Sequence, residues 1–136
     1  LHLPEDVICG ESVNDKNSKG PFKINEIPKE LMGLDIGPQT LSKFNNIISQ
    51  SGTVVWNGPM GVFEKNAYAK GTRDLGIHLA NCVENGLRVI VGGGDTSAAT
   101  EKYGLSQLMT HVSTGGGASL ELLSGNQLPA LSALEI

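Results

Sequence analysis

The stretch Leu87-Arg88-Val89-Ile90-Val91-Gly92-Gly93-Gly94-Asp95-Thr96 decides the fold class, because a short β-branched run passes directly into a glycine triplet. An apolar run of this kind, interrupted only by Arg88, is typical of a parallel strand covered on both faces. Helix-forming residues follow, over Ser97–Lys102, and a helix start offers unpaired N–H groups and the positive end of the helix dipole. The stretch therefore predicts a strand, a turn that can bind an anion, and a helix.

Two further stretches repeat this pattern. Thr53–Trp56 runs into Asn57-Gly58-Pro59-Met60-Gly61, and His111–Thr114 runs into Gly115-Gly116-Gly117-Ala118-Ser119, with a helix expected over Ala118–Leu123. One glycine triplet alone is more often a flexible connection. Two triplets, each after a β-rich run and each followed by a hydroxyl residue, favour a shared phosphate site.

Two amphipathic helices are expected between these strands. Pro38–Gln50 has proline near its start and one apolar stripe: Leu41, Phe44, Ile47 and Ile48. A second helix, ended by Asn85-Gly86, has its own stripe: Leu75, Leu79, Cys82 and Val83. The alternation of helices and strands predicts an α/β fold, a Rossmann-like parallel sheet with flanking helices that is part of a three-layer αβα domain. Its glycine turns would all lie along one edge of the sheet, where such folds bind ligands.

We divide the chain into three regions. Residues 1–32 read as an irregular lead-in with a hairpin, Val7–Cys9 and Phe22–Ile24, around a polar surface loop. Residues 33–127 form the βα core, and 128–136 is an apolar tail expected to dock on another part of the protein. Because the first residue is Leu1 rather than methionine, we expect residues 1–136 to be part of a larger nucleotide-binding domain.

Composition limits the possible partners. The 136 residues carry a net charge of −4 and scattered basic side chains, which argues against a nucleic-acid partner or an anionic membrane surface. No apolar run approaches the roughly 18 residues of a membrane span. Cys9 and Cys82 lack metal-ligand spacing and suit reduced thiols of a cytoplasmic protein.

The sequence lacks the common nucleotide-binding motifs. The last glycine of a dinucleotide fingerprint is replaced by Ser97 in one triplet and by Leu120 in the other, and no glycine is followed by the lysine of a P-loop. Helix-terminal amides and three acidic residues remain: Asp35, Glu64 and Asp95. Asp95, between a triplet and a helix, is either a Mg²⁺ ligand beside a phosphate or the N-cap of that helix.

Four blocks in order along the chain resemble the signature blocks of phosphoglycerate kinases: Gly33-Leu34-Asp35-Ile36-Gly37-Pro38, residues 54–64, residues 92–96, and residues 113–121. The resemblance covers nearly the whole chain and is to the C-terminal, nucleotide-binding part of these enzymes. It implies reversible, Mg²⁺-dependent phosphoryl transfer between 1,3-bisphosphoglycerate and ADP, which gives 3-phosphoglycerate and ATP in glycolysis.

The resemblance also implies roles for individual residues. Gly33 would lie beside the adenine, Glu64 would bind the ribose hydroxyls, and Asn57 and Pro59 would line the nucleotide. The phosphates and metal would be bound by Gly93, Gly94, Asp95 and Thr96, with Asp95 as the metal ligand. Gly93, Thr96 and Gly116 would take part in catalysis, with Gly116 holding the migrating phosphoryl group.

The partners implied by the resemblance are ATP or ADP and, through an N-terminal domain that this chain lacks, 1,3-bisphosphoglycerate or 3-phosphoglycerate. A monomer is expected for the intact enzyme, and no turnover is expected from this chain alone. Two other readings stay open, a non-catalytic phosphate- or nucleotide-binding module and a dinucleotide-dependent oxidoreductase domain. Three residues have structural explanations: Trp56 belongs to the core, and His78 and His111 are packed or hydrogen-bonded.

Overall fold

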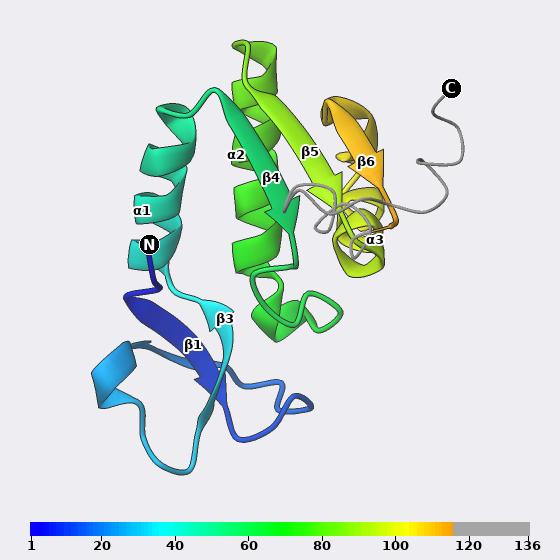
Figure 1. Cartoon of the computed structure of the whole chain (residues 1–136). Coiled ribbons are helices and arrows are strands. Elements are labelled where there is room, and N and C mark those ends of the chain that lie inside the picture. Colours follow the sequence, from blue (N-terminus) through cyan, green and yellow to red (C-terminus); the bar gives the residue numbers. More distant parts are fainter. Residues whose placement is uncertain (116–136) are drawn as a thin grey trace, which may run out of the picture.

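Two separate sheets and three α-helices make up the computed structural model, which describes residues 1–115 (Figure 1). The antiparallel sheet has the strand order β2-β1-β3 and the parallel sheet the order β4-β5-β6. The strands are β1 (Asp6–Gly10), β2 (Lys19–Lys23), β3 (Met32–Ile36), β4 (Thr53–Asn57), β5 (Arg88–Gly92) and β6 (His111–Ser113). The α-helices are α1 (Pro38–Ser49), α2 (Lys70–Glu84) and α3 (Gly94–Lys102), and the short 3-10 helices are Ile24–Glu26, Asn66–Tyr68 and Ser106–Leu108.

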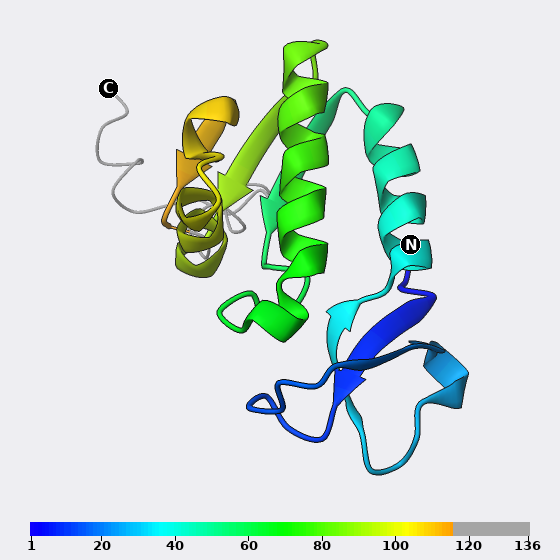
Figure 2. The ribbon, with the colours of Figure 1, turned by 180° about the vertical axis from the view of Figure 1, so that it is seen from behind.

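The parallel sheet confirms the α/β fold class. β4 pairs with β5 and β5 with β6, and a helix follows each of the first two strands. α2 and α3 lie on one face of this sheet, with α1 beside α2, as Figure 2 shows from behind. The core under these helices includes Leu79, Val89 and Val91, all with 0% of their surface exposed.

The opposite face of the sheet is less covered than predicted. Val55 is 39% exposed and Ile90 is half-buried, so the expected cover of β5 on both faces is incomplete within residues 1–115. The physical reason is that α1, α2 and α3 all belong to one layer. A third layer therefore remains a prediction.

The helix boundaries agree closely with the sequence pattern. α1 ends at Ser49, one residue earlier than expected, and α2 ends before Gly86, whose φ of 100° suits the turn that follows a helix. α3 differs, because it begins at Gly94 instead of Ser97. Gly93 has a φ of 97°, a value that favours glycine, and it turns the chain sharply enough for the helix to start at once.

The first third of the chain is more regular than the predicted lead-in. The hairpin is confirmed by the antiparallel pairing of β1 with β2, although the second strand is Lys19–Lys23 instead of Phe22–Ile24. β3 also pairs with β1 and was not predicted. The expected boundary between residues 32 and 33 consequently falls inside a strand. β3 has the sequence MGLDI, which lacks a β-branched or alternating run, so its extended form depends on pairing with β1.

A buried carboxylate from the antiparallel sheet caps α1. Gly37, the N-cap residue, has no side chain, and the N–H groups of Gln39 and Thr40 donate instead to the two oxygens of Asp6, at 3.0 and 2.8 Å. In return, Thr40 Oγ1 accepts hydrogen bonds from the N–H groups of Glu5 at 2.9 Å and Asp6 at 3.0 Å. These contacts, here called the Asp6–Thr40 clamp, join the start of α1 to β1.

Three expectations lie outside the described residues: the role of Gly116, the helix over residues 118–123, and the docking of residues 128–136. Within residues 1–115, no helix is long and apolar enough to cross a membrane.

Candidate functional site

The three strands that lead into the predicted turns end at one edge of the parallel sheet. In the strand register, Asn57 of β4 lies opposite Gly92 of β5, which lies opposite Ser113 of β6. Each of these residues is the last of its strand. Because parallel strands end at the same edge, the segments that follow them begin side by side, which confirms the predicted convergence as far as residue 115; the rest of the third turn lies outside the described residues.

The start of α3 presents backbone donors at this edge. Gly93 N–H donates to Ser113 O at 3.0 Å, and Ser97 Oγ donates to Gly93 O at 2.8 Å and to Ser113 O at 3.2 Å. These bonds fix the glycine turn to β6. The next amides along the chain, from Gly94 to Thr96, belong to the first turn of the helix, where N–H groups have no partner within the helix. A phosphate oxygen would satisfy them.

Asp95 lies in this first helical turn, but it is not the N-cap, because Gly93 takes that position. Its side chain is exposed and makes no hydrogen bond or ion pair within residues 1–115. The N-cap explanation of Asp95 is therefore wrong. A carboxylate in this place fits Mg²⁺, which often takes only one or two protein carboxylates and completes its coordination with phosphate oxygens and water. Within the described residues, no group of three or more His, Cys, Asp or Glu side chains could hold a metal by itself.

Thr96 connects two of the turns. It is 1% exposed, and its Oγ1 accepts a hydrogen bond from Gly58 N–H at 2.7 Å. Trp56 Nε1 donates to Gly58 O at 2.9 Å, so both backbone groups of Gly58 are paired with side chains. Asn57 and Pro59 flank this fixed residue, Asn57 exposed and Pro59 half-buried.

The segment that begins with the last residue of β4, residues 57–64, is called here the nucleotide loop because it carries three of the predicted nucleotide residues. Its middle is held by α2, since the N–H groups of Met60 and Gly61 donate to Thr72 Oγ1 at 3.0 and 3.3 Å. Its end is held by β3, since Val62 N–H donates to Leu34 O at 2.9 Å.

Phe63 anchors the last part of the loop. Its side chain is buried, its carbonyl accepts a hydrogen bond from Lys102 Nζ at 3.0 Å, and the same ammonium lies 5.8 Å from the centre of its ring. The next residue, Glu64, is exposed, as a carboxylate that receives a ribose from solvent would be.

Asp35 lies buried where β3, the nucleotide loop and α2 meet. Gly71 N–H donates to its Oδ2 at 2.9 Å and Ile36 N–H donates to its Oδ1 at 2.9 Å. Burial raises the pKa of Asp35 to about 6, although these two N–H groups favour the ionised form; Asp74 also raises it and Lys70 lowers it. Asp35 was singled out from the sequence as an acid at a strand end, and it lies inside the protein as a structural acceptor.

Gly33 is set apart from the three turns. It lies in β3 opposite Cys9, in the antiparallel sheet. The following residue, Leu34, contacts the end of the nucleotide loop through Val62. Gly33 is therefore linked to the nucleotide loop only indirectly, through the hydrogen bond that Leu34 O accepts from Val62 N–H.

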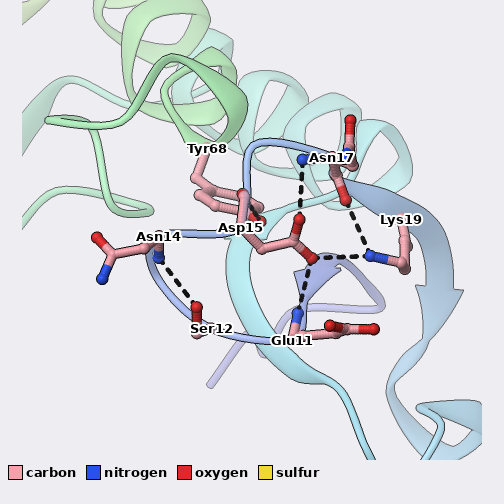
Figure 3. Close-up of polar contacts among 7 residues, drawn as sticks. All are labelled: Glu11, Ser12, Asn14, Asp15, Asn17, Lys19 and Tyr68. Atoms are coloured by element: carbon pink, nitrogen blue, oxygen red, sulfur yellow. Dashed lines mark hydrogen bonds and ion pairs between the residues drawn. The ribbon is translucent and has the colours of Figure 1, made fainter.

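The polar loop between β1 and β2 is built around one carboxylate (Figure 3). Asp15 accepts hydrogen bonds from the N–H groups of Glu11 and Asn17 and from Lys19 Nζ, the last at 2.8 Å, and these contacts lower its pKa to about 2. Asp15 O accepts a hydrogen bond from the buried Tyr68 hydroxyl at 2.6 Å. The loop thereby forms one wall of a hollow of about 490 Å³, lined by residues 13–16 and 64–67, beside Glu64.

The histidines have ordinary surroundings. His78 Nε2 lies 2.9 Å from Ser49 Oγ and 3.0 Å from Asn45 O, which confirms it as a hydrogen-bonded residue between α2 and α1. His111 was expected to be packed or hydrogen-bonded, and this is wrong: it is exposed at the start of β6, and its side chain makes no hydrogen bond within residues 1–115. Cys9 is buried and Cys82 half-buried, and both are free thiols.

Comparison with known proteins adds the deciding observation. A family model described as phosphoglycerate kinase matches residues 1–126 of the chain. The chain belongs to the phosphoglycerate kinase family.

Relatives in the phosphoglycerate kinase family are similar along almost all of this chain. The enzyme of Thermosynechococcus vestitus is 49% identical over 136 residues, which are 99% of this chain and 34% of that protein. The enzyme of Oenococcus oeni is 50% identical over 135 residues, 98% of this chain and 33% of that protein. The chain thus spans about a third of the length of the curated relatives it matches.

Solved phosphoglycerate kinase structures share the fold. The structure from Coxiella burnetii has a TM-score of 0.86 at 41% identity and covers 97% of this chain and 33% of that one. The structure from Pyrococcus horikoshii OT3 has a TM-score of 0.77 at 32% identity, with 96% and 31% covered.

Sequence reasoning missed Thr72, whose hydroxyl holds the nucleotide loop. The signal that the sequence offers is a threonine at the third position of a helix, which Thr72 shares with Thr40.

Proposed function

We propose that the chain is the C-terminal, nucleotide-binding part of a phosphoglycerate kinase that transfers a phosphoryl group between 1,3-bisphosphoglycerate and ADP, with 3-phosphoglycerate and ATP as products. The observation that carries this proposal is the register of Asn57, Gly92 and Ser113 at one sheet edge, beside the open amides of α3. Such an edge is where open α/β sheets bind nucleotides. The kinase names of the relatives support the reaction class.

The proposed nucleotide position follows from the site. The phosphates would lie against the amides of Gly94, Asp95 and Thr96, with Gly93 shaping the turn, and the nucleoside would extend along the nucleotide loop toward Glu64. Asn57 and Pro59 flank the turn fixed by Thr96. Gly33 is proposed to lie beside the adenine, through the contact between β3 and the loop.

Mg²⁺ is the proposed cofactor, and Asp95 would hold it together with phosphate oxygens. A metal ion in this place neutralises charge on the transferring phosphoryl group. The protein's own contribution is to hold the amides and the carboxylate in fixed positions, because phosphoryl transfer depends mainly on positioning and electrostatic stabilisation.

We also propose that phosphoglycerate is bound by a part of the enzyme that this chain lacks, that the intact enzyme is a cytoplasmic monomer, and that the chain alone has no turnover. The free thiols of Cys9 and Cys82 support a reducing compartment. The share of the relatives that the chain covers, 34% and 33%, supports the lack of turnover.

The test compares Asp95→Ala with Glu101→Ala, an exposed carboxylate near the other end of α3. ADP affinity of the complete enzyme is measured by calorimetry with and without Mg²⁺. Asp95→Ala should weaken binding in Mg²⁺ by about tenfold or more and leave metal-free binding nearly unchanged, since one charge-assisted contact contributes roughly 1.5–3 kcal/mol. Glu101→Ala should change neither. Equal weakening in both conditions would exclude the metal role, and tight binding of NADH instead of ADP would favour an oxidoreductase.

A further inference from the structure

The nucleotide loop is held in place by a hydroxyl that does not belong to it. Thr72, with 0% of its surface exposed, accepts hydrogen bonds from Met60 N–H at 3.0 Å and Gly61 N–H at 3.3 Å. These two amides lie between Pro59 and Glu64. The position of the loop's middle therefore depends on the first turn of α2.

Asp35 in turn holds that first turn of α2. Its Oδ2 accepts a hydrogen bond from Gly71 N–H at 2.9 Å, directly before Thr72. A Cβ added to Gly61 or to Gly71 would overlap Asp35 Oδ1, so glycine permits the loop and the helix to approach the same carboxylate. Asp35 and Thr72 together, called here the Asp35–Thr72 clamp, interlock β3, the loop and α2.

We propose that the Asp35–Thr72 clamp is a positioning device for nucleotide binding, which holds the loop in the geometry that receives the nucleotide. This inference rests on the proposed role of the loop and deepens it, because neither Asp35 nor Thr72 is among the nucleotide-contacting residues. A displacement of about 1 Å in a binding group can cost on the order of a hundredfold in catalysis. Loss of one anchoring hydroxyl should therefore be seen in the affinity for nucleotide.

The chain contains a matched control, the Asp6–Thr40 clamp. Thr40 is also the third residue of its helix, is also 0% exposed, and also accepts two backbone N–H groups, from Glu5 and Asp6. The segment that it holds leads into β1 and contains none of the proposed nucleotide residues. The same substitution in the two clamps thus removes the acceptor of two backbone N–H groups from two different segments; in Thr40 it also removes the hydroxyl that donates to Asp6 Oδ1 at 2.6 Å.

The experiment uses the complete phosphoglycerate kinase that carries this chain, with the variants Thr72→Val, Thr72→Ser and Thr40→Val. Steady-state kinetics give kcat and the KM values for Mg-ATP and 3-phosphoglycerate, and thermal unfolding gives the stability of each variant. Thr72→Val should raise the KM for Mg-ATP about tenfold and leave the KM for 3-phosphoglycerate within about twofold. Thr72→Ser, which keeps the hydroxyl, should have the wild-type KM for Mg-ATP. Thr40→Val should lower the Tm without changing either KM.

Amide hydrogen exchange without nucleotide separates the clamp from the proposed function. Met60 and Gly61 should exchange faster in Thr72→Val, and at the wild-type rate in Thr40→Val. An unchanged exchange rate in Thr72→Val, an unchanged KM for Mg-ATP, or an equal rise of that KM in both valine variants would overturn the positioning role. Failure of the wild-type enzyme to bind Mg-ATP, with the exchange result as expected, would overturn the proposed function and, with it, the nucleotide role of the clamp.

Discussion

Replacing Thr96 with valine should weaken the connection between α3 and the turn after β4. The hydroxyl of Thr96, which is 1% exposed, accepts a 2.7 Å hydrogen bond from Gly58 N–H, and valine has the same shape without an acceptor. Gly58 is half-buried, so water replaces the lost partner only in part. Because valine leaves no cavity, the lost hydrogen bond is the main effect, and the free energy of unfolding should fall by about 1–2 kcal/mol.

Thr100→Val in the same helix is the matched control. Thr100 is 0% exposed, but its hydroxyl donates to Ser97 O at 2.7 Å and lies 3.0 Å from Ser106 Oγ. No backbone N–H of residues 1–115 donates to it. Ser97 O lies in α3, where a helical N–H is also available to it, and Ser106 is half-buried and open to water, so this substitution should cost less, below about 1 kcal/mol.

Urea unfolding followed by the fluorescence of Trp56 measures both changes. Trp56 is the single tryptophan of the chain, and its indole N–H donates to Gly58 O at 2.9 Å, so it reports on the affected turn. With an m-value of about 2 kcal/mol/M, Thr96→Val should lower the midpoint by roughly 0.5–1 M. A midpoint for Thr100→Val as low as that for Thr96→Val would refute the assignment of the loss to Gly58.

Three further predictions follow from the buried carboxylates. Gly61→Ala should lower the free energy of unfolding by about 1–3 kcal/mol in urea, because the added Cβ would overlap Asp35 Oδ1. The control Gly52→Ala, with no atom within 4 Å of the new Cβ, should be nearly neutral, and equal losses in the two variants would contradict this. The folded-state pKa of Asp35, about 6, exceeds the ordinary 3.8, so the folded protein binds this proton more tightly than the unfolded chain does. Its contribution to stability is present at low pH and decreases by up to about 3 kcal/mol as the pH rises from about 4 to 6. In thermal unfolding from pH 4 to 7, Asp35→Asn should remove this dependence of stability on pH, and an unchanged dependence would assign it to other groups. Asp6→Ala leaves the N–H groups of Gln39 and Thr40 without their acceptor and should destabilise the protein by about 2–4 kcal/mol in urea unfolding at pH 7. A loss of only about 1 kcal/mol, typical of an exposed helix cap, would contradict this.

Local patterns determined most of the secondary structure. Two elements were predicted correctly from local patterns: α2, from the stripe of Leu75 and Leu79, and β5, from the β-branched run before Gly92. The spacing of apolar residues along the chain directly reflects which positions of a helix or strand are buried. The glycine triplet also indicated the right edge of the sheet, since parallel strands connected by helices must end together. β3 escaped prediction because its extended form comes from pairing with β1.

The tertiary structure alone decided how the site is held. The sequence left two roles for Asp95, Mg²⁺ ligand or helix N-cap. The structure excludes the N-cap role, because Gly93 takes that position with a φ of 97°. Asp35 and Thr72 are 37 residues apart in the chain, as their numbers give, and only the packing of β3 against α2 brings both onto the nucleotide loop. Hydrophobic periodicity depends on neighbours within a few residues, and so a sequence displays it. A buried hydrogen bond between distant segments depends on where the whole chain places them, and no local pattern records that.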